Sequence, residues 1–310
     1  MPVLRVDAVG DVPERHGGGT LERDLTQALR ATPPGSPVAI LVHGFKFCPF
    51  HPGFNPHRHI FALDPPATCR KALSWPTALG FTSPEPQAGL CLPFGWSARG
   101  SIWRAWHQAL SAGRALAKLL DTVAAQRDGP VDIIAHSLGA RVALTALAET
   151  KSPVGRVILM AGAEFCATAA TAMVQPEARG AEVFNVISRA NDPYDALVEW
   201  LMPAPEAGDR VLGAAPRIPG WLNLQIDDPA TRDALAPFGA VIAPARTRLC
   251  HWSSYLRPGL MPFYGALLRE RERLGMAQLR ACLPESATTR WGRLLPAISR
   301  SAQPPHAAQG

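Results

Sequence analysis

The chain contains a run of strand-forming residues that passes directly into a helix-forming run. It reads Val131-Asp132-Ile133-Ile134-Ala135-His136-Ser137-Leu138-Gly139, and helix formers follow from Ala140 to Glu149. The β-branched first half predicts a buried strand, so Ser137 falls on a sharp turn from strand to helix. Small residues stand two positions before and after Ser137, as closely approaching backbones require. The free N–H groups at the start of the helix suit an oxyanion, so this serine is a candidate nucleophile.

Strand and helix signals alternate on both sides of this turn. The clearest strands are residues 38–42, 154–160 and 182–188, with further candidates at 89–94 and 240–242. Helices are expected from Ser101 to about Gln126, at 167–175 and at 258–274. This alternation predicts an α/β fold, a mostly parallel doubly wound sheet with helices on both faces. We expect one domain over residues 1–298, with loop excursions at about 45–88 and 199–236, and a disordered tail at 299–310.

The composition is that of a globular protein. Hydrophobic residues make up 47% of the 310 residues and charged residues 18%, which excludes a disordered chain. No apolar run reaches the roughly 18 residues of a membrane span, and the start lacks the plan of a signal peptide. The six cysteines show no C-x-x-C spacing, so reduced thiols are expected. These features predict a soluble, cytoplasmic protein.

Positive charge is concentrated toward the end of the chain. From residue 246 onward there are ten Arg and three Glu. Such a segment could meet phosphates or an anionic membrane surface. A solvated helix face with Arg–Glu pairs is the simpler interpretation. We therefore expect no nucleic-acid partner and no transmembrane segment, with peripheral membrane contact as the less favoured alternative.

Two motifs together resemble those of the α/β-hydrolase superfamily. Residues 135–139 are similar to its G-x-S-x-G elbow, with alanine in the first small position. Val42-His43-Gly44-Phe45 is similar to the His-Gly that ends the strand before its oxyanion loop. The resemblance covers roughly residues 38 to 270 and implies the α/β-hydrolase fold. It also implies Ser137 as nucleophile, the N–H groups of Phe45 and Leu138 as oxyanion donors, and His43 as a residue that holds the loop.

The resemblance implies an acid and a base in the order Ser, acid, His. His251 and His306 follow Ser137 in the chain, and the Pro/Ala/Gln-rich surroundings of His306 leave His251 as the expected base. The acid is expected after the strand at 182–188, where Asp192 lies nearest the strand end. Asp195, which could instead cap a helix, and Glu164 remain alternatives.

The segment between Phe45 and Gly89 is rich in His and Phe. His51, His57 and His59 could suggest a metal site, but neither Cys48 nor Asp64 completes a convincing ligand set, so polar loop histidines are the simpler interpretation. The nucleotide motifs G-x-G-x-x-G and G-x-x-x-x-G-K-[ST] are absent from the expected positions, so no cofactor is expected.

These features predict a serine hydrolase that cleaves a carboxylic ester or thioester through an acyl-serine intermediate. The aromatic residues between Phe45 and Gly89 favour a small-molecule substrate with an apolar acyl group. An acyltransferase on the same fold, or a binding protein that keeps the fold without the activity, are the alternatives.

Overall fold

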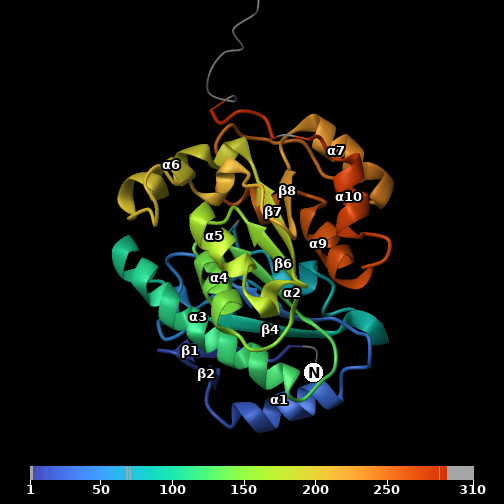
Figure 1. The fold of residues 1–310 in the computed structure, drawn as a ribbon. Helices are drawn as coiled ribbons and strands as arrows, with labels where there is room; N and C mark the ends of the chain where they lie inside the picture. Colours follow the sequence, from blue (N-terminus) through green and yellow to red (C-terminus); the bar gives the residue numbers. More distant parts are fainter. Residues whose placement is uncertain (1–2, 68, 70, 286, 292–310) are drawn as a thin grey trace, which may run out of the picture.

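A computed structural model describes residues 3–67, 69, 71–285 and 287–291 of the chain (Figure 1). An eight-stranded sheet runs through its centre in the order β2-β1-β4-β3-β5-β6-β7-β8. The strands are β1 (Val6–Val9), β2 (Val12–Arg15), β3 (Val38–Val42), β4 (Leu90–Gly95), β5 (Val131–His136), β6 (Val154–Met160), β7 (Glu182–Ile187) and β8 (Trp221–Gln225). Strands β1 and β2 pair antiparallel, and every other pair of neighbours in the sheet is parallel. The carboxyl ends of β3, β5, β6 and β7 therefore meet at one edge, where ligands bind in open α/β sheets.

Helices cover both faces of the sheet, as Figure 1 shows. One face carries α1 (Leu21–Arg30), α3 (Ile102–Ala124), α4 (Gly139–Glu149) and α5 (Cys166–Met173). The other carries α2 (Trp75–Ala78), α7 (Pro229–Leu235), α8 (Ser253–Leu256), α9 (Leu260–Arg269) and α10 (Met276–Cys282). The remaining helix, α6 (Asp192–Leu201), follows β7.

The central strands are buried on both faces because their side chains alternate between two apolar cores. In β5, Ile133 and Ala135 pack with α3 and α4, whereas Ile134 belongs to the core beneath α9. All six β5 residues are buried. A strand that is apolar on both faces needs a layer of helices on each side. This is why the central strands could be predicted from the sequence.

The expected α/β fold is confirmed, with differences toward the end of the chain. Residues 240–242 are not a strand. Within the described residues the last strand is β8, which lies inside the expected loop excursion at 199–236. Because Asn223 and Gln225 are polar, β8 does not stand out in the sequence as an apolar run. Both side chains are hydrogen-bonded in the structure, Asn223 to Asn185 at 2.9 Å and Gln225 to Thr288. The helix expected at 258–274 ends at Arg269 and begins after Gly259, whose φ of 91° separates it from α8.

The segment at 45–88 contains α2 and three 3-10 turns, at 52–54, 56–58 and 86–88. The tail expected at 299–310 lies outside the described residues.

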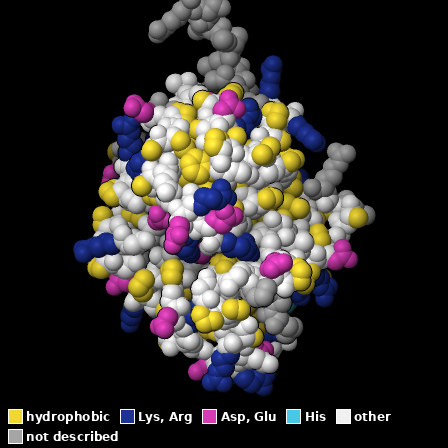
Figure 2. Space-filling model, turned by 90° about the vertical axis from the view of Figure 1, so that its right-hand side faces the viewer, with side chains coloured by type: hydrophobic (Ala, Val, Ile, Leu, Met, Phe, Trp, Pro, Cys, Tyr) yellow, Lys and Arg dark blue, Asp and Glu magenta, His cyan; other side chains and the backbone are white. Residues whose placement is uncertain are grey.

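None of the helices in the described part of the chain is both long and apolar enough to cross a bilayer. Figure 2 shows side chains of both charges next to one another on one face, and the basic C-terminal region contains such a pair in Arg273 and Glu270.

Candidate active site

Ser137 occupies the sharp turn between β5 and α4. Its φ of 55° is in the left-handed region, which is unfavourable for a residue with a Cβ. The neighbouring strand and loop hold this conformation. The Ser137 N–H donates to Met160 O at 3.0 Å, and the Ser137 carbonyl accepts from the N–H of Ala163 at 2.9 Å. Strained backbone that the surroundings fix in this way is typical of functional sites.

Two glycines allow the turn to pack against the end of β3. A Cβ on Gly44 would lie 2.7 Å from Ser137 Cβ, and a Cβ on Gly139 would lie 2.7 Å from His43 O. Both distances are shorter than real Cβ contacts, so each position requires glycine for this approach. The two glycines therefore bring the backbone after β3 to within contact distance of the serine.

His251 is within hydrogen-bond distance of Ser137. Its Nε2 lies 2.8 Å from Ser137 Oγ, and its Nδ1 lies 2.7 Å from Asn191 Oδ1. An amide oxygen can only accept, so Nδ1 carries the proton and Nε2 has a free lone pair toward the serine hydroxyl. The Tyr194 ring stacks on the imidazole with centroids 4.8 Å apart. The tautomer and the ring plane are thus those that a base for Ser137 needs.

The surroundings keep His251 neutral. Burial lowers the pKa of His251 well below 6.5, and the nearby His136 and Lys71 lower it further. His136, whose ring centroid lies 4.8 Å from that of His251, has a pKa lowered by burial to about 4. A neutral imidazole is the form that accepts a proton.

The acid expected at Asp192 is not in contact with His251. Its Oδ2 accepts from the Trp291 N–H at 2.6 Å, and its Oδ1 lies 3.2 Å from Arg189 Nη1. Asn191, one residue earlier, bonds to His251 instead. Asn191 ends a 3-10 turn, η5 (Arg189–Asn191), and Asp192 begins α6, so the two side chains point in different directions.

The two alternative acids differ in their relation to the site. Glu164 pairs with Arg141, and its Oε1 accepts from the Phe165 N–H at 2.7 Å, away from His251. Asp195 accepts from Asn191 Nδ2 at 2.9 Å. It therefore lies behind Asn191 and not against the imidazole.

The expected oxyanion donors, Phe45 and Leu138, follow the end of β3 and Ser137 respectively. Neither Phe45 N–H nor Leu138 N–H donates to a backbone carbonyl within the part of the chain that the structure describes. Both residues line the same cavity as Ser137. His43 holds this loop, as the sequence suggested: its Nε2 accepts from the Trp96 N–H at 3.0 Å, and its carbonyl accepts from Trp96 Nε1 at 2.9 Å.

A cavity of about 850 Å³ contains Ser137 and His251. Most of its wall is apolar, and three cations and one carboxylate, Asp195, also line it. The apolar wall comes from the segment after β3, from α3, from α6, and from α8 with the loop before it. It includes Phe45, Phe47, Phe54, Ile102, Trp106, Tyr194, Leu197, Val198, Leu201, Trp252 and Tyr255. The cations are Lys46, Arg58 and Lys71. Such a wall fits an apolar group beside the serine hydroxyl.

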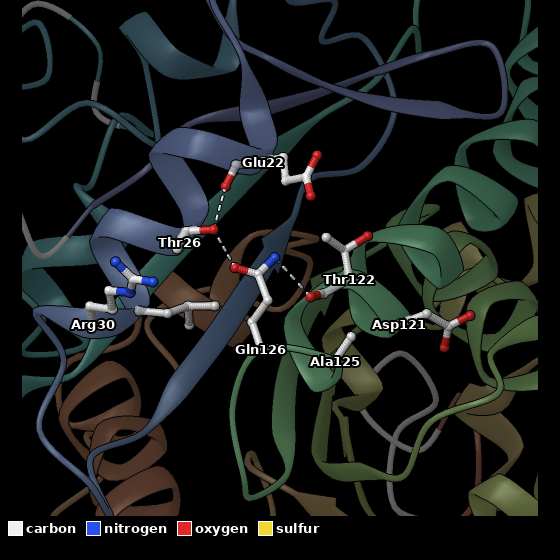
Figure 3. A pocket seen from close by; sticks show the side chains of 8 residues that line it. Glu22, Thr26, Arg30, Asp121, Thr122, Ala125 and Gln126 are labelled. Carbon is white, nitrogen blue, oxygen red and sulfur yellow. Dashed lines mark hydrogen bonds between the residues drawn. The ribbon is translucent and has the colours of Figure 1, made fainter.

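A second hollow of about 640 Å³ lies between α1 and the end of α3, and it shares no lining residue with the cavity of Ser137 (Figure 3). Its polar side chains bond to one another and to the helices: Thr26 Oγ1 lies 2.6 Å from Gln126 Oε1, and Gln126 Nε2 donates to Thr122 O (Figure 3). These groups satisfy each other, and the hollow contains no nucleophile with a base.

One group of side chains among the described residues could hold a metal ion, namely Asp7, His16 and His57. The Asp7 carboxylate lies 2.6 Å from His16 Nδ1 and 2.7 Å from His57 Nε2, which are hydrogen-bond distances. The other two histidines considered for a metal are separate from this group. His51 caps a 3-10 turn, and His59 Nε2 lies 3.1 Å from Cys69 Sγ.

Three residues of the site were not expected from the sequence: Asn191, His136 and Tyr194. Asn191 is not found by a search for carboxylates, because its side chain is neutral. Its place in the chain, between the end of β7 and the start of α6, is the one feature that could have indicated it. His136 directly precedes Ser137, and Tyr194 is the third residue of α6.

Comparison with known proteins agrees with this geometry. A search of curated protein sequences gives no match. A sequence model of the alpha/beta hydrolase family matches residues 39–302, which includes the strand-turn-helix around Ser137 and the loop of His251. With a match over most of its length and a mostly parallel sheet flanked by helices, the chain belongs to the alpha/beta hydrolase family.

Proposed function

We propose that this protein is a serine hydrolase that cleaves carboxylic esters or thioesters through an acyl-serine intermediate. The observation that carries the proposal is the 2.8 Å contact between Ser137 Oγ and His251 Nε2, with Ser137 in a left-handed turn at the start of a helix. A serine hydroxyl is a weak nucleophile until an adjacent neutral base can take its proton. Both partners line one cavity, so a substrate can reach them.

The first half of the reaction acylates the serine. Ser137 Oγ attacks the carbonyl carbon of the substrate while its proton moves to His251 Nε2, and the carbonyl oxygen becomes an oxyanion. The N–H groups of Phe45 and Leu138 donate to this oxyanion. The C–O or C–S bond to the leaving group then breaks, and His251 Nε2–H gives its proton to the departing oxygen or sulfur. Asn191 Oδ1 accepts from Nδ1–H throughout and keeps the ring in place.

The second half repeats the same steps with water. His251 Nε2 takes a proton from water, whose oxygen attacks the acyl carbon. The bond from that carbon to Ser137 Oγ breaks, and the proton returns to Oγ. A carboxylic acid leaves, and the serine hydroxyl is restored. The apolar wall of the cavity favours an apolar acyl group for this substrate.

Labelling with a fluorophosphonate and hydrolysis of p-nitrophenyl esters of increasing chain length test the proposal. We expect label on Ser137, and no label or ester hydrolysis in Ser137→Ala. Ser253→Ala is the matched control, because Ser253 follows His251 by two residues and, among the residues that the structure describes, its hydroxyl bonds only to Cys250 O, at 3.1 Å. Label that persists on another serine in Ser137→Ala contradicts the assignment. Faster transfer to an added alcohol than to water identifies an acyltransferase instead.

A further inference from the structure

Asn191 is hydrogen-bonded on both sides of its amide. Its Oδ1 lies 2.7 Å from His251 Nδ1, and its Nδ2 donates to Asp195 Oδ1 at 2.9 Å. Asp195 lies in the first turn of α6 and is only 3% exposed. Ser137, His251, Asn191 and Asp195 therefore form one continuous chain of hydrogen bonds that ends on a buried carboxyl group.

The two ends of an amide are chemically different, and Asp195 determines which end faces the imidazole. An ionised carboxylate only accepts, so it attracts the NH₂ end of Asn191. The oxygen end then faces His251 and requires a proton on Nδ1, which leaves the Nε2 lone pair toward Ser137. If the amide turned over, its NH₂ would face Nδ1 and favour the tautomer with a proton on Nε2. That tautomer cannot accept the serine proton.

Asp195 differs from its neighbour Asp192 in how its charge is balanced. Asp192 lies 3.2 Å from Arg189 Nη1 and 4.0 Å from Arg290 Nε. Among the described residues, no Lys or Arg forms an ion pair with Asp195. A buried carboxyl group without a cation is costly, and structural carboxylates are normally paired. The arrangement therefore points to a role for Asp195 beyond stability.

The backbone is shaped to admit this carboxyl group. A 3-10 turn, η6 (Leu212–Ala214), passes directly over it, and a Cβ on Gly213 would lie 2.0 Å from Asp195 Oδ2. Only glycine allows the turn to approach so closely. The Gly213 carbonyl in turn accepts from Arg189 Nη2 at 2.7 Å, which fixes the turn in this place.

We propose that Asp195 is a positioning residue for the Ser137–His251 pair: through the Asn191 amide it selects the His251 tautomer and supplies the negative charge that a carboxylate would otherwise provide at the imidazole. The inference rests on the proposed function. Asp195 bonds to Asn191 and not to the imidazole, so its effect reaches His251 through two hydrogen bonds. Loss of its charge lowers the rate of the chemical step and leaves substrate binding largely unchanged.

The charge of Asp195 also responds to pH. Burial raises the pKa of Asp195 to about 7. The charged groups that face it are Arg290 and Arg189, which favour ionisation, and Asp192 and Glu199, which oppose it. A carboxyl group with a raised pKa loses its charge as the pH falls through that pKa. The wild-type rate should therefore fall partly near pH 7, before His251 itself takes up a proton.

The test compares Asp195→Asn with Asp192→Asn, since both remove one charge from the first turn of α6, and of the two carboxylates Asp195 is the one that accepts from the Asn191 amide. With a short neutral p-nitrophenyl ester at pH 8, we expect kcat of Asp195→Asn to fall roughly tenfold to hundredfold, with KM within about twofold of wild type. Asp192→Asn should keep kcat within about threefold. The partial step near pH 7 should be absent from Asp195→Asn and present in Asp192→Asn.

A second readout is independent of activity. In protein labelled with ¹⁵N at histidine, the two ring nitrogen shifts report the His251 tautomer, and a His251→Gln sample assigns the signal. We expect the Nδ1–H tautomer in the wild type at pH 8 and a mixture in Asp195→Asn. If the wild type hydrolyses no ester, the proposed function fails, and the tautomer still tests the role of Asp195.

Two results overturn the inference. One is a folded Asp195→Asn whose kcat matches that of Asp192→Asn. The other is a His251 tautomer that is the same in the wild type and in Asp195→Asn. Asp195→Ser, which is smaller and also uncharged, decides the same question if Asp195→Asn does not fold.

Discussion

Gly44→Ala should slow ester hydrolysis about 10²-fold without unfolding the protein. The new Cβ would lie 2.7 Å from Ser137 Cβ, 2.9 Å from His136 O and 3.3 Å from Ser137 Oγ. Carbon atoms in contact prefer about 3.5–4.0 Å, so the serine must retreat by about 1 Å. A displacement of about 1 Å at reacting groups costs on the order of 10²-fold in rate, whereas one added methyl costs about 1–3 kcal/mol of stability. Gly44 does not have a positive φ, so the contact alone is being changed.

The assay is kcat/KM for a short p-nitrophenyl ester, together with the melting temperature. Gly53→Ala is the matched control, since it lies in the same segment after β3 and its Cβ would come no closer than 3.7 Å to His51. We expect Gly53→Ala to behave as wild type and Gly44→Ala to lose about 10²-fold in kcat/KM. If the two variants have equal kcat/KM while both remain folded, the close approach to Ser137 does not matter and the reasoning is refuted.

Three further outcomes follow from the site. In Asp195→Asn, kcat/KM should fall through an apparent pKa below 6.5 as the pH is lowered, because burial lowers the pKa of His251 and the protonated ring cannot accept the Ser137 proton; a value above 6.5 contradicts this. Asn191→Asp places a carboxylate at His251 Nδ1, so the apparent pKa of His251 in the pH profile of kcat/KM should rise by about 1–3 pH units. An unchanged apparent pKa would show that the contact between residue 191 and His251 is absent in solution. Glu164→Gln should leave kcat within about threefold of wild type. It should lower the free energy of unfolding, measured in urea, by about 1–3 kcal/mol, because it weakens the bond to Arg141. A large loss of kcat in a folded variant would show that Glu164 takes part in the reaction.

The central strands could be predicted from the sequence because each is apolar on both faces and ends in a turn. β3, β5 and β6 are runs of this kind. β8 could not be read in this way, because Asn223 and Gln225 interrupt its apolar residues and their partners, Asn185 and Thr288, are distant in the chain. Residues 240–242 look like a strand locally, but no neighbouring strand is placed to pair with them among the described residues.

The candidate site also contains residues that could be predicted from the sequence and residues that could not. Ser137 could be predicted because one continuous stretch contains the strand, the turn and the helix. The partner of His251 could not, because the choice between Asn191 and Asp192 depends on how η5 turns the chain before α6, and on Arg189 and Trp291, which attract the Asp192 carboxylate. A choice by chemical type favours the carboxylate of Asp192, whereas the fold places the amide of Asn191 beside His251.

Helix α6 has a consequence for anyone who wishes to redesign the specificity of this protein. Its first turn follows Asn191 directly and contains Asp195, and its later residues Leu197, Val198 and Leu201 line the cavity. We expect a substitution that enlarges or fills the cavity from α6 to disturb the start of this helix as well, where Asn191 bonds to His251. Libraries on this wall should therefore yield variants in which selectivity and turnover change together. Phe54 and Ile102 line the cavity from other segments, so chain-length selectivity can be altered there while the turnover number is preserved.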